Sequence, residues 1–178
     1  MLRIVRDIKI KPRITVSELV EMMGNSGGFT ALYIARAVEV LEKMIRDNDC
    51  IRFLSFIGAP IGTGLRGVIS ELIKRRFFNI VITTCGALDH DIARSLKEYY
   101  EGDFWMDDET LRKQGYHRLG CVLIPLENYG PTIEKFTQEL LEEEYDRGLR
   151  EVCSSDIAYL IGMRIKDENS FLKNAAEN

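Results

Sequence analysis

Two apolar segments, each followed directly by a loop of small residues, constrain the fold of this chain more than any other feature. They span residues 51–57 and 79–84 and are separated by one helix length. A short, nearly unbroken apolar run is typical of a parallel strand that is covered on both faces. The order strand, helix, strand therefore predicts a β-α-β unit, in which the carboxyl ends of both strands lie at one edge of a sheet.

The loop after the first segment is rich in glycine. Gly62, Gly64 and Gly67 fit the spacing G-x-G-x-x-G, and Gly58 precedes them. Because glycine has no Cβ atom, such a strand-to-helix turn lets a phosphate approach the backbone N–H groups, and the pattern indicates a nucleotide site. The alternative is that these glycines serve only the turn and the close packing of the helix.

Periodic patterns predict the other elements. Thr15 and Glu18 form a capping box at the start of a short helix that Gly24 ends, and Thr30 caps a longer helix. The elements expected after the first strand are helix 64–76, strand 79–84, helix 89–99, strand 118–124, helix 131–146 and two short helices at 154–164 and 169–178. The predicted fold class is α/β, a parallel Rossmann-like sheet with flanking helices and a helical N-terminal extension. Three parallel strands would leave one edge and one apolar face uncovered, so an oligomer or a partner chain is expected.

Length and composition indicate one globular domain over residues 1–178, with 1–50 as the helical extension and 51–178 as the α/β part. The net charge of −4 provides no basic field for nucleic acid. The apolar runs are far shorter than the roughly 20 residues that span a bilayer, so no membrane association is expected. Four cysteines without a C-x-x-C pair suit reduced thiols, and a cytoplasmic location is expected.

Five pieces of the sequence occur in an order that points to one family. They are VSELVEMMGNSGGFTALYIARAVEVLEKMI, FLSFIGAPIGTGLRGVI, VITTCGALDHDIARSL, YHRLGCVLIPLENYG and SDIAYLIGMRIKDENSFL. With these pieces the chain resembles deoxyhypusine synthase over most of its length. The second and third are the most specific, because two threonines, a small pair and then an acidic and histidine-bearing cluster at a strand end are not a general Rossmann feature.

The resemblance implies an NAD site on the two small-residue loops. The residues that would line it are Gly58, Ala59, Pro60, Ile61, Gly62, Thr84, Cys85, Gly86 and His90. Asp89 and His90 would face the polyamine substrate, since a carboxylate can pair with an ammonium group and an imidazole can accept a proton near neutral pH. The alternative is that Asp89 only caps the following helix and that His90 packs against a neighbouring loop.

The activity implied by the resemblance is the NAD-dependent transfer of the 4-aminobutyl group of spermidine to a lysine of the translation initiation factor 5A precursor. The GGGxxKHH and SWGK motifs of the family, the second of which carries the reacting lysine, have no counterpart here, so no catalytic residue is expected in this chain. The chain would supply the NAD-binding half, completed by a C-terminal-half or homologous subunit. The alternatives are a non-catalytic regulatory or structural partner of such a complex and a nucleotide-binding protein with another substrate.

The remaining polar and sulfur side chains indicate no second site. His117 is expected to be a surface or structural histidine, and Cys85 a small buried residue because nothing basic lies next to it in the sequence. Two histidines without paired cysteines make a metal site unexpected. Asp103, Asp107 and Asp108 form an acidic loop around Trp105 to which the sequence assigns no role.

Overall fold

The structure is a computed structural model that describes residues 2–178. These residues form two compact units, one reaching to Ile51 and the other running from Arg52 to Asn178. The limit between the units falls next to the limit expected between residues 1–50 and 51–178. The interpretation of residues 1–178 as one domain stays a prediction.

The N-terminal unit is a pair of packed helices, α1 (Val16–Ser26) and α2 (Phe29–Arg46). The predicted capping box is confirmed: the Glu18 N–H donates to Thr15 Oγ1 at 3.2 Å, and the Thr15 N–H donates to the Glu18 carboxylate at 2.8 Å. These two bonds satisfy backbone donors that the first turn of a helix leaves without partners.

The predicted end of the first helix at Gly24 and the predicted start of the second at Thr30 are both wrong. Helix α1 continues past Gly24 and ends at Gly27, whose φ of +66° suits a left-handed C-cap. Gly24 instead lies at the contact with α2, where a Cβ atom would come within 2.9 Å of the Ala35 Cβ. Thr30 lies inside α2, because Gly28 is the N-cap of that helix.

The α/β fold is confirmed for the second unit, which contains two parallel strands, β1 (Phe53–Phe56) and β2 (Ile80–Thr83). Between them lie α3 (Gly58–Gly62) and α4 (Arg66–Lys74), and α5 (Cys85–Leu96) follows β2. Leu54, Phe56 and Val81 point from one face of the sheet into the core, which is formed by these helices and the C-terminal helices. The opposite face is exposed, so the expectation of a strand pair covered on both faces does not hold within the described residues.

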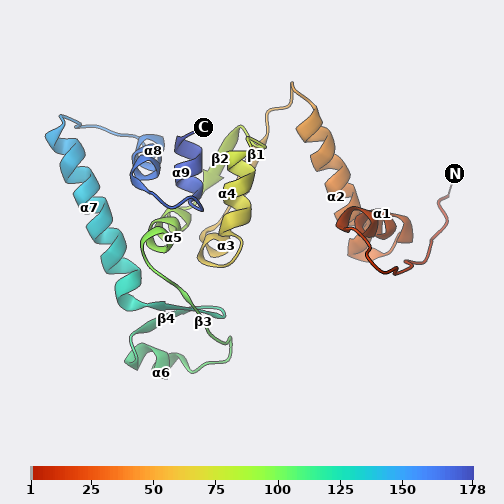
Figure 1. Ribbon diagram of the computed structural model, residues 1–178, viewed down its shortest axis with the longest axis horizontal. Helices are drawn as coiled ribbons and strands as arrows, with labels where there is room; N and C mark the ends of the chain where they lie inside the picture. Colours follow the sequence, from red (N-terminus) through yellow and green to blue (C-terminus); the bar gives the residue numbers. More distant parts are fainter. Residues whose placement is uncertain (1) are drawn as a thin grey trace. The chain divides into compact units, whose positions relative to one another are not determined.

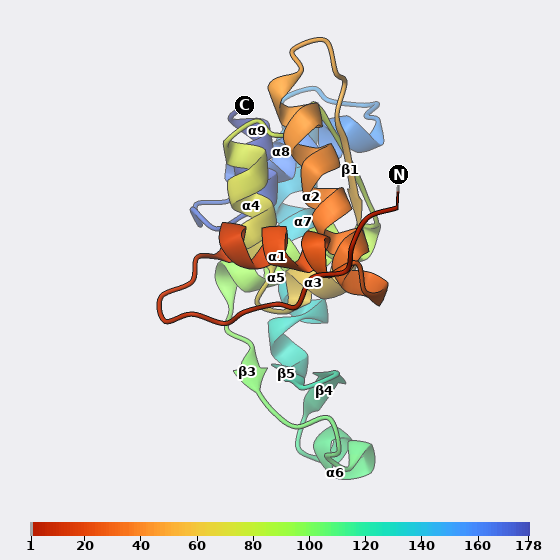
Figure 2. The same cartoon turned by 90° about the vertical axis from the view of Figure 1, so that its right-hand side faces the viewer.

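The predicted third parallel strand at 118–124 is wrong. This segment forms an antiparallel hairpin of β4 (Tyr116–Leu119) and β5 (Val122–Pro125), and β5 also pairs with the short strand β3 (Tyr100–Glu101). Gly120, with a φ of +63°, and Cys121 form the two-residue loop between β4 and β5. A positive φ in a two-residue loop reverses the chain, so the apolar run is divided into two strands. Figure 2 shows these strands together, with α6 (Asp108–Lys113) beside them.

The acidic loop around Trp105 builds the N-terminus of α6. Asp107 is the N-cap and accepts from the Thr110 N–H at 2.8 Å, while Asp108 forms an ion pair with Arg118 of β4 at 2.7 Å. Asp103 accepts from the Trp105 N–H at 2.7 Å. These three aspartates therefore have structural partners.

The C-terminal part follows the predicted helical pattern. After the short η1 (Leu126–Asn128), the chain forms α7 (Gly130–Asp146) with Pro131 in its first turn, then α8 (Ser154–Arg164) and α9 (Phe171–Ala176). Helix α9 packs against α4, α5 and α8, and Figure 1 shows α8 and α9 side by side. A Cβ atom at Gly162 would lie 2.3 Å from the Leu172 carbonyl oxygen, so only glycine permits this close contact between α8 and α9.

Candidate functional site

The candidate site lies where β1 and β2 end, because α3 and α5 both begin there and contact each other. Ile57 is the N-cap of α3 and Thr84 is the N-cap of α5, and in the described chain no side chain caps either helix. The first N–H groups of a helix carry a partial positive charge, so the N-terminus of α5 is a suitable place for a phosphate. Thr84, Cys85 and Gly86, the second group of residues predicted to line the NAD site, form the start of α5.

The two groups of residues predicted to line the NAD site, 58–62 and 84–86, meet at a contact between two glycines. A Cβ atom at Gly58 would lie 2.8 Å from the carbonyl carbon of Gly86, so the backbones of α3 and α5 touch directly. Gly58, Ala59, Pro60, Ile61 and Gly62 form a helix of five residues, not the open loop that was expected.

The glycines of the G-x-G-x-x-G pattern have different surroundings. A Cβ atom at Gly62 would lie 2.5 Å from Leu119 Cδ2 and 3.2 Å from His90 Nε2, which is a packing reason for glycine. A Cβ atom at Gly64 or Gly67 would meet no atom of the described chain within 4 Å. Packing therefore accounts for Gly62, whereas Gly64 lies in open space between α3 and α4.

Asp89 lies in the second turn of α5, because that helix begins at Cys85 and not near residue 89 as predicted. The alternative in which Asp89 caps this helix is wrong. The Cys85 thiol donates to Asp89 Oδ1 at 3.8 Å. The Asp89 carboxylate raises the pKa of the Cys85 thiol, and burial raises the pKa of Asp89 itself.

Cys85 is exposed, so the expectation of a small buried residue is wrong. The nearby carboxylate disfavours the thiolate, which is the reactive form of cysteine. The interpretation that Cys85 is not a nucleophile stays a prediction. All four cysteines are free.

His90 is half-buried in a cluster of aromatic side chains. Its Nδ1 lies 3.0 Å from the Tyr99 hydroxyl, and its ring centroid lies 5.1 Å from that of Tyr129. Burial lowers the pKa of His90 and raises the pKa of Tyr99. At neutral pH the imidazole is therefore uncharged and Tyr99 keeps its proton. His117 is exposed, and its ring centroid lies 6.3 Å from that of Tyr129.

Arg94, one turn after His90 on α5, holds the end of α3. Its Nη1 donates to the carbonyl oxygens of Ile61 at 2.9 Å and Thr63 at 2.5 Å. A guanidinium at the C-terminus of a helix satisfies carbonyl groups that have no partner within the helix. Arg94 thereby fixes the position of α3 relative to α5.

A buried ionic network lies behind the site. Arg66 of α4 donates to Asp91 of α5 and to Asp167, both at 2.6 Å, and Asp91 also accepts from Ser170 at 2.7 Å. The side chain of Asp91 is fully buried. Burial raises the pKa of Asp91, and the guanidinium of Arg66 opposes that rise. This network ties the segment before α9 to α4 and α5.

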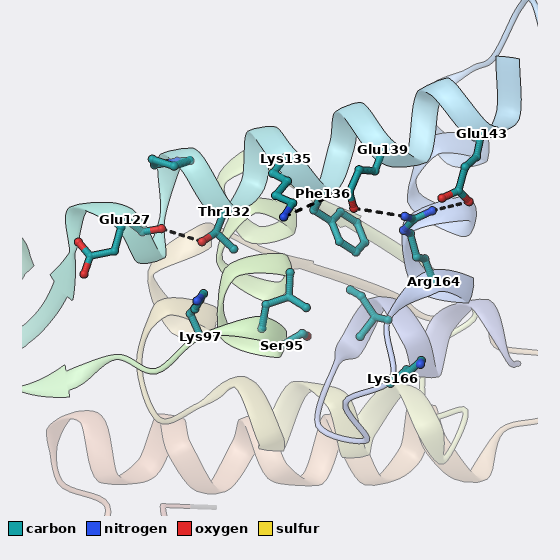
Figure 3. A pocket seen from close by; sticks show the side chains of 13 residues that line it. Ser95, Lys97, Glu127, Thr132, Lys135, Phe136, Glu139, Glu143, Arg164 and Lys166 are labelled. Carbon is teal, nitrogen blue, oxygen red and sulfur yellow. Dashed lines mark hydrogen bonds and ion pairs between the residues drawn. The ribbon is translucent and has the colours of Figure 1, made fainter. Parts of the chain in front are cut away.

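A groove of about 970 Å³ lies elsewhere in the same unit, among the end of α5, η1, α7 and the end of α8. Figure 3 shows Arg164 bound between Glu139 and Glu143, with Phe136 beside them. The predicted site residues do not line this groove. The chemistry expected from Asp89 and His90 therefore does not belong to it.

Sequence reasoning missed four residues that shape the candidate site: Arg94, Tyr99, Leu119 and Tyr129. Arg94 could have been found, since it is four residues after His90 and so shares its helix face. Leu119 and Tyr129 come from the hairpin and from the start of α7, and only the folded structure brings them to α5. In residues 2–178 no group of three His, Cys, Asp or Glu side chains is placed to hold a metal ion.

The parallel strands and the helices that begin at the strand ends place this chain among α/β proteins. The family model described as deoxyhypusine synthase matches residues 18–178, and the chain belongs to this family.

The similar proteins agree with this assignment. A "Probable deoxyhypusine synthase" from Ignicoccus hospitalis is 45% identical over 174 residues, which are 97% of this chain and 53% of the relative. One from Picrophilus torridus is 44% identical and covers 98% of this chain and 55% of the relative. A solved structure described as a "putative deoxyhypusine synthase" from Entamoeba histolytica matches with a TM-score of 0.63 and 19% identity, covering 98% of this chain and 59% of the other. The chain thus spans about half the length of the curated relatives it matches.

Proposed function

We propose that this chain supplies the NAD-binding half of a deoxyhypusine synthase-type enzyme. The reaction is the NAD-dependent transfer of the 4-aminobutyl group of spermidine to a lysine of the translation initiation factor 5A precursor. The observation that carries the proposal is the contact of the α3 and α5 N-terminal segments at Gly58 and Gly86, in a chain of this family. The location is cytoplasmic and the working form is an oligomer.

The residues at this contact fit a dinucleotide. The uncapped N-terminus of α5 offers backbone N–H groups to a phosphate, and Gly64 leaves the approach to the backbone between α3 and α4 open. Bound NAD would accept a hydride from spermidine. The side chains of the α3 segment offer few hydrogen-bond donors, so backbone groups would hold the cofactor.

Asp89 and His90 would act on the polyamine side. An ammonium group of spermidine that approaches Asp89 would favour its carboxylate form and so oppose the effect of burial. His90 is uncharged at neutral pH and can accept a proton, and Tyr99 and Tyr129 hold its ring in place. The lysine that carries the aminobutyl group would come from a C-terminal-half or homologous subunit.

A non-catalytic partner subunit is the second candidate function. The observation that favours it is the set of apolar and small residues in α3, which leaves the cofactor without side-chain hydrogen bonds. Such a subunit would dock to a complete relative and alter its activity without binding NAD itself.

The experiment that separates these two candidate functions measures NAD binding to the assembled complex, with Gly64→Val as the variant. A Cβ atom at Gly64 would meet no atom of the described chain within 4 Å, so the fold should be retained while the side chain blocks the approach of a phosphate. Gly28→Val is the matched control, because Gly28 also lies in open space but belongs to the N-terminal unit. Loss of NAD binding in Gly64→Val alone supports the proposal. A complex that binds no NAD at this chain, or is unaffected by Gly64→Val, contradicts it.

A second measurement concerns the missing lysine. This chain alone, incubated with NAD, spermidine and the factor precursor, should form no deoxyhypusine, since the residue that carries the aminobutyl group is absent. Labelled factor produced by this chain alone would contradict the proposal that another subunit supplies the reacting lysine.

A further inference from the structure

One face of the β1–β2 sheet is apolar and open. The strands pair in parallel with Phe53 beside Ile80 and Ser55 beside Ile82, so these four side chains lie on the same face. Phe53 is 55% exposed, Ile80 42% and Ile82 55%, and Ile57 at the end of β1 is 62% exposed. We name the five residues, Phe53, Ser55, Ile57, Ile80 and Ile82, the open sheet face.

The other face of the same strands shows what a covered face looks like. Leu54, Phe56 and Val81 pack against the buried core, and the Phe56 ring meets Phe171 of α9 edge-on at 5.3 Å. Both faces are thus equally apolar in sequence, but only one is covered by helices within the described residues.

Parallel sheets occur almost only with helices on both faces, whereas a face that meets water carries polar residues at alternate positions. The open sheet face has no charged residue, and Ser55 is its only polar one. Each strand also has one unpaired edge, because among residues 2–178 this sheet contains only β1 and β2. A two-stranded sheet of this kind is an incomplete part of a larger layer.

We propose that the open sheet face is the docking surface for the part of the deoxyhypusine synthase fold that lies outside the region matched by this chain. The inference rests on the proposed function, from which it takes the partner. This chain is covered almost completely by its relatives but spans only 53% and 55% of them, so about half of the relatives' length lies outside the matched region. The docking element is a helix with an apolar face, since helices are what cover parallel strands.

The test is the binding of this chain to the part of the Ignicoccus hospitalis relative outside the matched region, produced as a separate polypeptide. Light scattering and titration calorimetry measure the complex, without NAD or spermidine. Ser55→Glu and Ile82→Glu place a carboxylate in the centre of the open sheet face. Leu141→Glu on α7 is the matched control, because Leu141 is 47% exposed and lies outside this face.

The expected result is a complex of one chain with one partner, whose affinity falls at least about tenfold in Ser55→Glu and Ile82→Glu because an unpaired charge is then buried. Leu141→Glu should bind as the unchanged chain does. Ser55 is already exposed, so its variant folds even if Ile82→Glu does not, and circular dichroism verifies this.

Four outcomes overturn the inference: no complex with the unchanged chain, equal binding by all variants, a dimer of this chain alone that Ser55→Glu dissociates, or a large loss of the isolated chain's stability in Ser55→Glu without a change in binding. The third would assign the face to a second copy, and the fourth would show that it is covered from within the same chain. An assembled pair that lacks synthase activity contradicts the proposed function but leaves the docking surface intact.

Discussion

Replacing Asp91 with alanine should remove a large part of the stability of the α/β unit. Asp91 has no exposed surface and accepts three hydrogen bonds, from Arg66 at 2.6 Å, Ser170 at 2.7 Å and the Leu172 N–H at 2.9 Å. In Asp91→Ala the Arg66 guanidinium keeps only Asp167 as an ionic partner. The two other donors lose their acceptor in the protein interior.

The expected loss is about 3–5 kcal/mol, the usual cost of removing one partner from a buried ion pair. Each buried donor left without an acceptor costs about 1–3 kcal/mol, so the Leu172 N–H and the Ser170 hydroxyl alone account for much of this sum. A natural domain has a free energy of unfolding of only about 5–15 kcal/mol, so the variant should be close to unfolding.

Urea denaturation followed by circular dichroism measures the free energy of unfolding, and hydrogen exchange at the amides of α9 locates the loss. Glu42→Ala is the matched control, because it removes the exposed Glu42–Arg46 ion pair of α2 and should change stability by less than about 0.5 kcal/mol. A loss below about 1 kcal/mol in Asp91→Ala, or one no larger than the control, would refute the reasoning that this network holds α9 on α4 and α5.

Three further predictions concern other parts of the same unit. Gly162→Ala should cost about 1–3 kcal/mol in urea denaturation, because its Cβ would overlap the Leu172 carbonyl group between α8 and α9; an unchanged midpoint would contradict this contact. Asp89→Asn should speed alkylation of Cys85 by iodoacetamide, followed by mass spectrometry, because the carboxylate that raises the thiol pKa is gone; an unchanged rate would contradict the pairing. Burial lowers the pKa of His90, so just below pH 6.5 the unfolded state binds more protons than the folded state, and the free energy of unfolding falls as the pH decreases there. His90→Gln should make this fall smaller between neutral and mildly acidic pH. An unaltered dependence of the free energy of unfolding on pH would contradict this prediction.

Local signals in the sequence were sufficient for the elements that depend on neighbouring residues. The Thr15–Glu18 capping box, the two apolar strands and the helix that begins at Gly130 and Pro131 all appear where they were predicted, within a few residues. Each depends on contacts within a few positions of the chain, such as a cap or a hydrophobic period. The family and the α/β fold class followed from the same local pieces in their order.

Only the tertiary structure decided which surfaces those elements share. The apolar run at 118–124 became a hairpin and not a third parallel strand, because Gly120 reverses the chain and β5 finds its partners in β4 and β3. Gly62 proved to be a packing residue against Leu119 and His90, while a Cβ atom at Gly64 in the same motif would meet no atom of the described chain within 4 Å. A sequence states that a residue is apolar or small, but the choice of its neighbour depends on contacts between distant segments, which no local period contains.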